Sequence, residues 1–422
     1  MSNDLGWQSL SVASLIEAGV LEIGDGYRAK NSEMGNRGLP FLRIANVTNG
    51  GIDLANADLL AEANLGKVGS KISRSGDVVF TTKGSVGRFA YVKPDTPQFV
   101  YSPQVSYWRV LEDGILISRF LLYWLQGPEF TKQVYQVKGL TDMADYVNLR
   151  DQRKMTIRAP SVPTQRKIAD ILSAYDDLIE NNTRRIQILE EMAQTIYREW
   201  FVHFRFPGHE NVEMVDTELG LVPAGWKWVT LDQIAEVNAR SLRVGELPDT
   251  VQYVDISSVS TGQIDNVREM PSSEAPGRAR RSVRHGDTIW SCVRPNRRSY
   301  SLILYPDENV IASTGFAVLS PVDIPFPYLY QAVTTDDFVA YLTNHARGAA
   351  YPAVTSEDFK EAVVLMPDSS RLHRYSTIAE PLVRLKHSLV SRNHVLRQSR
   401  DLLIPKLLSG EINICGLIEQ IN

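Results

Sequence analysis

Cysteine is scarce in this 422-residue chain, which has only Cys292 and Cys415. Two distant cysteines give neither a disulfide framework nor zinc-ligand spacing, and they are typical of a reducing compartment. Long hydrophobic runs are also missing, because the longest run of aliphatic and aromatic residues, 120–125, is too short to cross a bilayer. The first residues lack the basic and apolar parts of a secretory signal. We therefore expect a cytoplasmic protein with no membrane partner.

Catalytic signatures are missing too. The sequence contains no glycine-rich phosphate loop, no Gly-x-Gly-x-x-Gly, no Gly-x-Ser-x-Gly and no His-Glu-x-x-His. It also has no Asn-Pro-Pro-Tyr or Asp-Pro-Pro-Tyr of the kind that amino-methyltransferases use, and its seven histidines show no metal-ligand spacing. We expect no catalytic residue, no metal site and no cofactor bound by this chain. An enzyme with an unrecognised motif stays open as an alternative.

Excess positive charge is absent overall, since the formal net charge is -4. That total disfavours a nucleic-acid binder, because such domains are usually basic. The local distribution differs from the total: between Arg268 and Tyr300 there are eight arginines, three acidic residues and no lysine. An arginine-rich island in an acidic chain can set the local field regardless of the net charge.

The most informative feature that is present is an internal repeat. Gly6-Trp7 returns as Gly225-Trp226, residues 44–53 return as 256–265, and residues 75–80 return as 285–290. The offset stays near 210 residues, far longer than the roughly 20 to 50 residues of solenoid and propeller repeats. The chain therefore contains two whole modules in tandem.

Two long helices are predicted from apolar residues spaced alternately by three and four, over 168–200 and over 378–403. The first should run from about 164 to 203, or about 60 Å. Pro381 should occupy the first position of the second helix, which would begin near Glu380 and end at Pro405 and Gly410. Burial of both apolar seams favours an antiparallel coiled-coil pair; a long helix packed on a domain is the alternative.

Each half also contains a β-rich module. Strands are expected at 77–81 and 86–92 around a turn at 83–85, and at 287–291 and 300–305 around a loop at 292–298. Single helices are expected over 120–135 and 328–342. The predicted fold class is α+β, with two recognition domains joined by the helix pair in a pseudo-twofold repeat. The predicted domains are 1–160, 161–205, 206–368 and 369–422.

This order of elements resembles the specificity subunit of type I restriction–modification systems. Residues 163–172, 178–182 and 196–201 look like the family's central conserved region, and residues 403–412 look like its distal one. The segments 76–80, 83–87 and 286–290 look like parts of its target-recognition domains. In the second module, residues 293–298 depart from the Lys-Gly-Ser-Val-Gly turn of the first, which leaves the contacts of that module uncertain.

The resemblance implies a function. Each recognition domain would read one half of a split target in double-stranded DNA, and the helices would fix the gap between the halves. The helices would also dock two methyltransferase subunits, which use S-adenosylmethionine to methylate adenine N6, and restriction subunits would join the complex. This chain would itself be non-catalytic. The alternative from a different class is a protein-interaction scaffold with duplicated binding modules.

Candidate DNA contacts of the second module come from its arginine-rich loop. Arginine binds guanine O6 and N7 through two parallel bonds, and asparagine can bind adenine in the same way. These residues are candidate base contacts, although they could equally touch phosphates or belong to a solvated loop: Arg294, Asn296, Arg297 and Arg298. A second group is expected to bind phosphates and so to give affinity without sequence information: Arg278, Arg280, Arg281 and Arg284.

Candidates elsewhere rest on weaker patterns. In the first module, Lys83, Ser85 and Arg88 flank a glycine turn that could approach DNA closely, or form an ordinary exposed hairpin. Further candidates follow a strand or lie in glycine-containing loops at matching places of the two halves, where plain connectors are the alternative: Arg43, Asn46, Lys138 and Tyr351. Trp7 and Trp226 are expected to be core anchors, with stacking platforms as the alternative. The aromatic residues that end the first long helix are expected to cover its junction with the second domain, with a methyltransferase dock as the alternative: Trp200, Phe201, Phe204 and Phe206.

Overall fold

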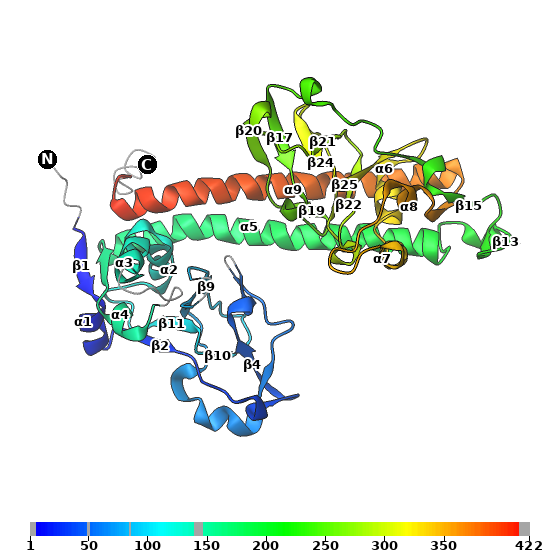
Figure 1. Ribbon diagram of the computed structural model, residues 1–422. Coiled ribbons are helices and arrows are strands. Elements are labelled where there is room, and N and C mark those ends of the chain that lie inside the picture. Colours follow the sequence, from blue (N-terminus) through cyan, green and yellow to red (C-terminus); the bar gives the residue numbers. More distant parts are fainter. Residues whose placement is uncertain (1–5, 49–50, 84–85, 139–146, 413–422) are drawn as a thin grey trace, which may run out of the picture. The chain divides into compact units, whose positions relative to one another are not determined.

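The computed structural model of the chain describes residues 6–48, 51–83, 86–138 and 147–412 (Figure 1). The chain divides into two compact units, one made of residues 1–181 with 392–422 and the other of residues 182–391. This division cuts both long helices, α5 (Val162–Tyr197) and α9 (Ser369–Ser409). Each unit therefore holds one β-rich module and one stretch of each helix. The four domain boundaries expected above stay a prediction.

The first unit contains two four-stranded sheets, with strand orders β2-β11-β8-β9 and β10-β4-β7-β3. Two strand pairs, β1 with β12 and β5 with β6, accompany them. The strands are β1 (Gln8–Ser11), β2 (Leu21–Asp25), β3 (Met34–Gly35), β4 (Gly38–Leu42), β5 (Val47–Thr48), β6 (Gly51–Ile52), β7 (Leu59–Ala61), β8 (Val78–Thr81), β9 (Phe89–Tyr91), β10 (Val100–Tyr101), β11 (Val105–Val110) and β12 (Thr156–Ala159). The shorter helices are α1 (Val12–Glu17), α2 (Ser118–Gln126), α3 (Pro128–Lys138) and α4 (Leu149–Arg153).

The second unit repeats this plan, with sheets ordered β16-β25-β22-β23 and β20-β17-β24-β21 and the pairs β15 with β26 and β18 with β19. A hairpin of β13 and β14 precedes them. The strands are β13 (Met214–Thr217), β14 (Gly220–Pro223), β15 (Lys227–Thr230), β16 (Ala235–Val237), β17 (Thr250–Val254), β18 (Val259–Ser260), β19 (Gln263–Ile264), β20 (Arg268–Pro271), β21 (Ala279–Ser282), β22 (Thr288–Ser291), β23 (Tyr300–Leu302), β24 (Val310–Ser313), β25 (Phe316–Pro321) and β26 (Val363–Met366). The shorter helices are α6 (Phe326–Ala332), α7 (Asp336–His345) and α8 (Ser356–Lys360).

Strand pairing confirms the sequence repeat. β4 pairs in parallel with β10, and at the matching place β17 pairs in parallel with β24, while the other partners in both sheets are antiparallel. The predicted strand–loop–strand elements are present as β8 with β9 and as β22 with β23. One difference is the edge strand β21, which pairs with β24, whereas the first unit has a single bridge from Ile72 to Val100 at that place.

The two single helices expected beside the sheets were wrong, because each is a pair. Gly127 separates α2 from α3, and the proline that follows has no N–H with which to continue the helical bonding. In the second unit, the Thr335 hydroxyl accepts the backbone N–H of Phe338 and so starts α7 as a separate helix.

The expected start of the second long helix was also wrong. α9 begins at Ser369, continues through Pro381 and Pro405, and ends at Ser409 before Gly410, whose φ is +76°. Pro381 lies on the exposed side of the helix, so the carbonyl of Thr377 that it leaves without a helical donor can bind water. Buried Tyr375 and Ala379 before the proline and Val383 after it hold the helix on its core. The first long helix agrees with expectation, with a π-helical turn (Arg198–Val202) at its end.

Within each unit, the stretches of α5 and α9 run antiparallel. In the first unit, Asp176 Oδ1 lies 2.6 Å from Arg400 Nη1, and farther along α5 the carbonyl of Ile179 accepts Asn393 Nδ2 at 3.2 Å. In the second, Glu190 Oε1 lies 2.8 Å from Lys386 Nζ, and the rings of Tyr197 and Tyr375 pack edge to face. In both units, residue numbers rise along α5 as they fall along α9.

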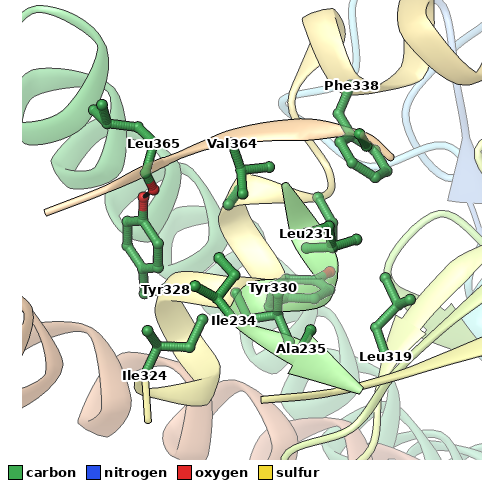
Figure 2. Close-up of a cluster of buried hydrophobic side chains, with 14 of the residues drawn as sticks. Leu231, Ile234, Ala235, Leu319, Ile324, Tyr328, Tyr330, Phe338, Val364 and Leu365 are labelled. Carbon is green, nitrogen blue, oxygen red and sulfur yellow. Dashed lines mark hydrogen bonds between the residues drawn. The ribbon is translucent and has the colours of Figure 1, made fainter. Parts of the chain in front are cut away.

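The second unit's main core joins the end of α5 to the β-rich module. Trp200, Phe201 and Phe206 are buried there with Trp226, so these aromatic residues cover the junction, as predicted. Figure 2 shows part of the cluster, in which the hydroxyl of Tyr328 donates to the backbone carbonyl of Leu365. Phe204 packs against this core, and Trp7 is partly buried against the corresponding core of the first unit.

Candidate nucleic-acid interface

The loop between β22 and β23 has an unusual backbone. It contains a 3₁₀ turn (Pro295–Arg297) between Arg294 and Arg298, whose φ angles are +53° and +55°. Residues other than glycine rarely adopt this left-handed conformation, which costs on the order of 1 kcal/mol or more and persists only where the surroundings enforce it. The loop is therefore held in shape by contacts outside itself.

Those contacts come from the glycine-containing loop after α7. The backbone N–H of Arg294 donates to the carbonyl of Pro352 at 2.7 Å, and Val293 forms a β-bridge with Ala353. The Arg294 side chain donates from Nη2 to the carbonyl of Ala350 at 3.1 Å. Its guanidinium also lies over the Tyr351 ring, 4.6 Å from the centroid. The structure thus brings together two predicted site residues, Arg294 and Tyr351, from loops that the sequence treated separately.

Three further candidates form the rest of this loop. Arg298 Nη2 lies 2.6 Å from Asp336 Oδ1 in the first turn of α7. Asn296 and Arg297 are exposed at the tip of the 3₁₀ turn. Among the described residues, neither the Asn296 amide nor the Arg297 guanidinium has a hydrogen bond or ion pair within the chain. Sequence reasoning did not predict a role for Asp336. The signal available was its place next to Thr335, a residue type that often begins a helix.

The arginines around β21 differ in exposure. Arg278 is exposed, whereas the Arg280 side chain bonds back to the carbonyl of Ala279 at 2.6 Å. Arg281 donates from Nη1 to Ser241 Oγ at 3.0 Å, and its Nε is buried without a partner. Burial lowers the pKa of Arg281. Of this group, Arg278 and Arg284 are exposed, and the Arg284 backbone N–H donates to Asp287 Oδ2 at 2.7 Å.

The first module presents its candidates differently. Lys83 is exposed just after β8, and Arg88 is half-buried, with Nη1 donating to the carbonyl of Val47 at 3.4 Å. Arg43 Nη2 forms an exposed ion pair with Asp58 at 2.9 Å, and Asn46 Oδ1 accepts the Arg43 backbone N–H. Asn46 therefore shapes a turn. Ser85 and the side chain of Lys138 lie outside the described residues.

The first module also contains a buried polar network that sequence reasoning did not predict. Asp77 is fully buried and accepts Arg109 Nε at 2.6 Å, Arg109 Nη2 at 2.8 Å and the Tyr101 hydroxyl at 2.6 Å. Burial and the Asp77 carboxylate raise the pKa of Tyr101 well above its usual value. The internal repeat could have indicated that Asp77 is structural, because Asp287 occupies the matching place in the second module. Burial raises the pKa of Asp287. This network is a structural support for the loop-bearing sheet.

Residues 6–48, 51–83, 86–138 and 147–412 contain no group of three or more His, Cys, Asp or Glu side chains that could hold a metal ion. Over the same residues, no helix has the length and hydropathy needed to span a bilayer.

The fold defines a protein with two copies of one β-rich module, each packed with a stretch of two long antiparallel helices. A family model described as the type I restriction modification DNA specificity domain matches residues 7–191. The type I restriction enzyme MjaIX specificity subunit of Methanocaldococcus jannaschii is 21% identical, over 82% of this chain and 79% of the relative. The MjaVIII specificity subunit of the same organism is 26% identical over 72% of this chain and 73% of the relative.

Further similarity extends to other organisms and to solved structures. The EcoDI specificity subunit of Escherichia coli is 22% identical over 73% of this chain and 77% of that protein. A crystal structure of a type I restriction–modification S subunit from M. genitalium has the same fold, with a TM-score of 0.59 and 16% identity over 96% of this chain and 97% of that one. The chain is thus similar over most of its length to specificity subunits of type I restriction–modification systems.

Proposed function

We propose that the two modules of this chain each read one half of a bipartite target in double-stranded DNA. The observation that carries the proposal is the repeated module, whose strand pairing matches in both units except at one edge strand. Each copy presents a different basic loop at the same place of the sheet. Different loops on a common scaffold are what two different half-site sequences require.

The reading surfaces proposed are the loops that follow β8 and β22. In the second module the surface consists of the β22–β23 loop and the loop of Tyr351, which is hydrogen-bonded to it. Exposed Arg278, which precedes these loops in the sequence, is a further member. In the first module it includes Lys83 and Arg88, with Ser85 and Lys138 as further candidates from sequence alone. Arg43 is a weaker candidate, because Asp58 already neutralises it.

A second proposal concerns partner docking by the long helices. Exposed apolar residues recur at an offset of 207 residues: Ile171 and Leu178 on α5 match Ile378 and Leu385 on α9, and Ile188 matches Val395, with exposed fractions between 37% and 58%. By the division of the chain, each unit carries one such set of three. Equivalent apolar positions in both units favour two copies of the same partner. We propose two methyltransferase subunits as that partner.

The remaining parts of the proposal follow from the family. The paired helices form a coiled coil that sets the gap between half-sites. The methyltransferase subunits bring S-adenosylmethionine and the adenine N6 chemistry, restriction subunits join the assembly, and this chain supplies recognition without catalysis. The antiparallel contacts of α5 and α9 within each unit support the coiled coil.

The proposal is tested with the chain co-expressed with its methyltransferase subunit in a host lacking other adenine methylation. Sequencing of modified bases should reveal one bipartite motif with a fixed gap. Binding of the purified complex to that motif should weaken steeply with salt, because phosphate contacts release counterions. No bipartite motif, together with gel shifts that are flat in salt, would instead favour a protein-interaction scaffold.

A further inference from the structure

The four polar candidates in the β22–β23 loop differ in how they are engaged within the protein. The Arg294 guanidinium donates to the Ala350 carbonyl and lies over the Tyr351 ring. The Arg298 guanidinium forms an ion pair with Asp336. The side chains of Asn296 and Arg297 have no such partner among the described residues, and both are exposed. The loop therefore contains two anchored residues that flank two free ones.

The anchors fix the backbone from both sides of the turn. Arg294 and Arg298 are the residues with positive φ on either side of Pro295–Arg297, and Pro295 itself is buried and has a restricted φ. The Arg297 N–H bonds to the Arg294 carbonyl at 2.9 Å, and the Arg298 N–H bonds to the Pro295 carbonyl at 3.0 Å. The free side chains thus project from a turn whose conformation is set before any ligand arrives. A preformed turn reduces the entropy lost on binding.

We propose, on the basis of the DNA-reading function above, that Arg297 and Asn296 are the specificity-determining residues of the second module. Arg297 reads a guanine through O6 and N7, and Asn296 reads an adenine through N6 and N7. Arg294, Arg298 and Tyr351 are positioning residues, which act by holding the tip of the turn. The second half-site accordingly contains at least one G·C pair whose recognition depends on Arg297.

The alternative for Arg297 is a phosphate contact. Losing a phosphate contact weakens binding almost equally for all sequences, whereas losing a base contact relaxes one position of the motif. Lysine separates the two further, because it keeps the charge needed at a phosphate but lacks the planar pair of donors needed for guanine.

The experiment uses the full complex with methyltransferase subunits and sequencing of modified adenines. Arg297→Ala is expected to relax one G·C position of the second half-site, with discrimination there falling about 5- to 150-fold and the first half-site unchanged. Arg297→Lys is expected to relax the same position. Asn296→Ala should relax a different, A·T position. Lys227→Ala, at an exposed position of β15 outside the proposed reading surfaces, serves as the control that leaves both half-sites intact.

The positioning role is tested at Tyr351, which is 69% exposed and therefore tolerates substitution. Tyr351→Ala is expected to relax the same position as Arg297→Ala, and the double variant should be no worse than Arg297→Ala alone. Tyr351→Phe keeps the ring under Arg294 and should restore full selectivity. Relaxation at a position of its own would make Tyr351 a reader and overturn the positioning assignment.

Two negative outcomes have different meanings. If the wild-type complex gives no bipartite motif, the proposed function itself fails. If the wild-type motif is present but Arg297→Ala leaves every position intact, or lowers methylation uniformly and is rescued by Arg297→Lys, the assignment of Arg297 is overturned while the function stands.

Discussion

Asp77 is a single residue on which the first module's sheet depends. Its carboxylate lies fully buried against Arg109 and Tyr101, and the Arg74 backbone N–H completes its bonding. Removing one partner of a buried ion pair costs about 3–5 kcal/mol, and without Asp77 the buried Arg109 would keep only its longer carboxylate contact, to Glu22 at 3.4 Å. We expect Asp77→Ala to lower the free energy of unfolding by that amount in urea titrations. Asp58→Ala, which breaks the exposed pair with Arg43, should change it by less than about 1 kcal/mol.

Two histidines on the second unit predict a pH dependence of stability. Burial lowers the pKa of His285, with Arg384 contributing and Glu380 opposing, and burial likewise lowers the pKa of His387, with His285 contributing. Both pKa values are then below those of the unfolded chain, near 6.5, so the unfolded state takes up more protons as the pH falls. Their stabilising effect is full above about pH 6.5 and is lost as the pH decreases toward the folded-state values.

The measurement is the melting temperature of the full chain at pH 7.5 and pH 5.5. The wild type should lose more stability between these values than a variant with His285→Asn and His387→Asn. Asparagine keeps an acceptor for the Tyr305 N–H, which bonds to His285 Nδ1 at 3.2 Å. An equal decrease in both proteins would show that these histidines do not contribute.

At this scale the sequence predicted which residues bear charge on the loops but not how they are paired. Arg294 and Tyr351 lie 57 positions apart, and their contact depends on loops meeting in space. The engagement of Arg298 by Asp336 and of Arg43 by Asp58 is tertiary in the same sense. Residue type therefore indicated the chemistry available, while folding decided which groups stay free.

Among the elements, α9 contains a proline that its surroundings tolerate. Because Pro381 removes one helical bond in the interior of α9, it costs about 3 kcal/mol, of which roughly 1 kcal/mol is regained by restricting the unfolded chain. We expect Pro381→Ala to raise the free energy of unfolding by about 2 kcal/mol, measured by denaturant titration. Pro163→Ala, in the first turn of α5, should have a much smaller effect because no helical bond is missing there. A lower free energy of unfolding for Pro381→Ala would contradict this expectation and would indicate that Pro381 gives α9 a shape on which its packing depends.

The elements show where periodicity is sufficient and where it is not. The three-and-four spacing predicted α5 closely because its seam is continuous and its start is marked by Pro163 and Thr164. The predicted start of α9 was wrong because the rule that a proline begins or breaks a helix takes no account of the buried residues on both sides of Pro381. The three-and-four spacing also merged α2 with α3 and α6 with α7, since apolar spacing continues across a break that one glycine or one capping threonine creates.

For the whole molecule, the recurring apolar positions predict a stoichiometry. Leu178→Asp should remove one methyltransferase subunit and Leu385→Asp the other, because each change places a charge in one of two equivalent contact sets. Native mass spectrometry of the complexes should show one partner lost in each single variant and both lost in the double variant. Gln187→Asp, at an exposed polar position of α5, is the control and should retain two. Retention of both partners in all variants would move the docking site elsewhere.

The repeat allowed the whole molecule to be predicted in outline. Two modules at an offset near 210 residues gave the duplicated sheets, and the resemblance to specificity subunits gave the family. What the sequence could not give was the division of the long helices, since the three-and-four spacing runs on past residues 181 and 391, and the polar seam residues Asn182 and Arg392 do not by themselves mark a boundary between modules. That division follows from which side chains of each helix pack on which module.

The division of α5 and α9 has a consequence for how such a gene can change. The second unit is one uninterrupted stretch, 182–391, that carries its own share of both helices, whereas the first is assembled from two separate stretches. A single cassette exchange with crossovers inside the helices would therefore transplant the second unit complete with its internal packing. Replacing the first would require two coordinated exchanges, so diversification by recombination should be simpler for the half of the target read by the second.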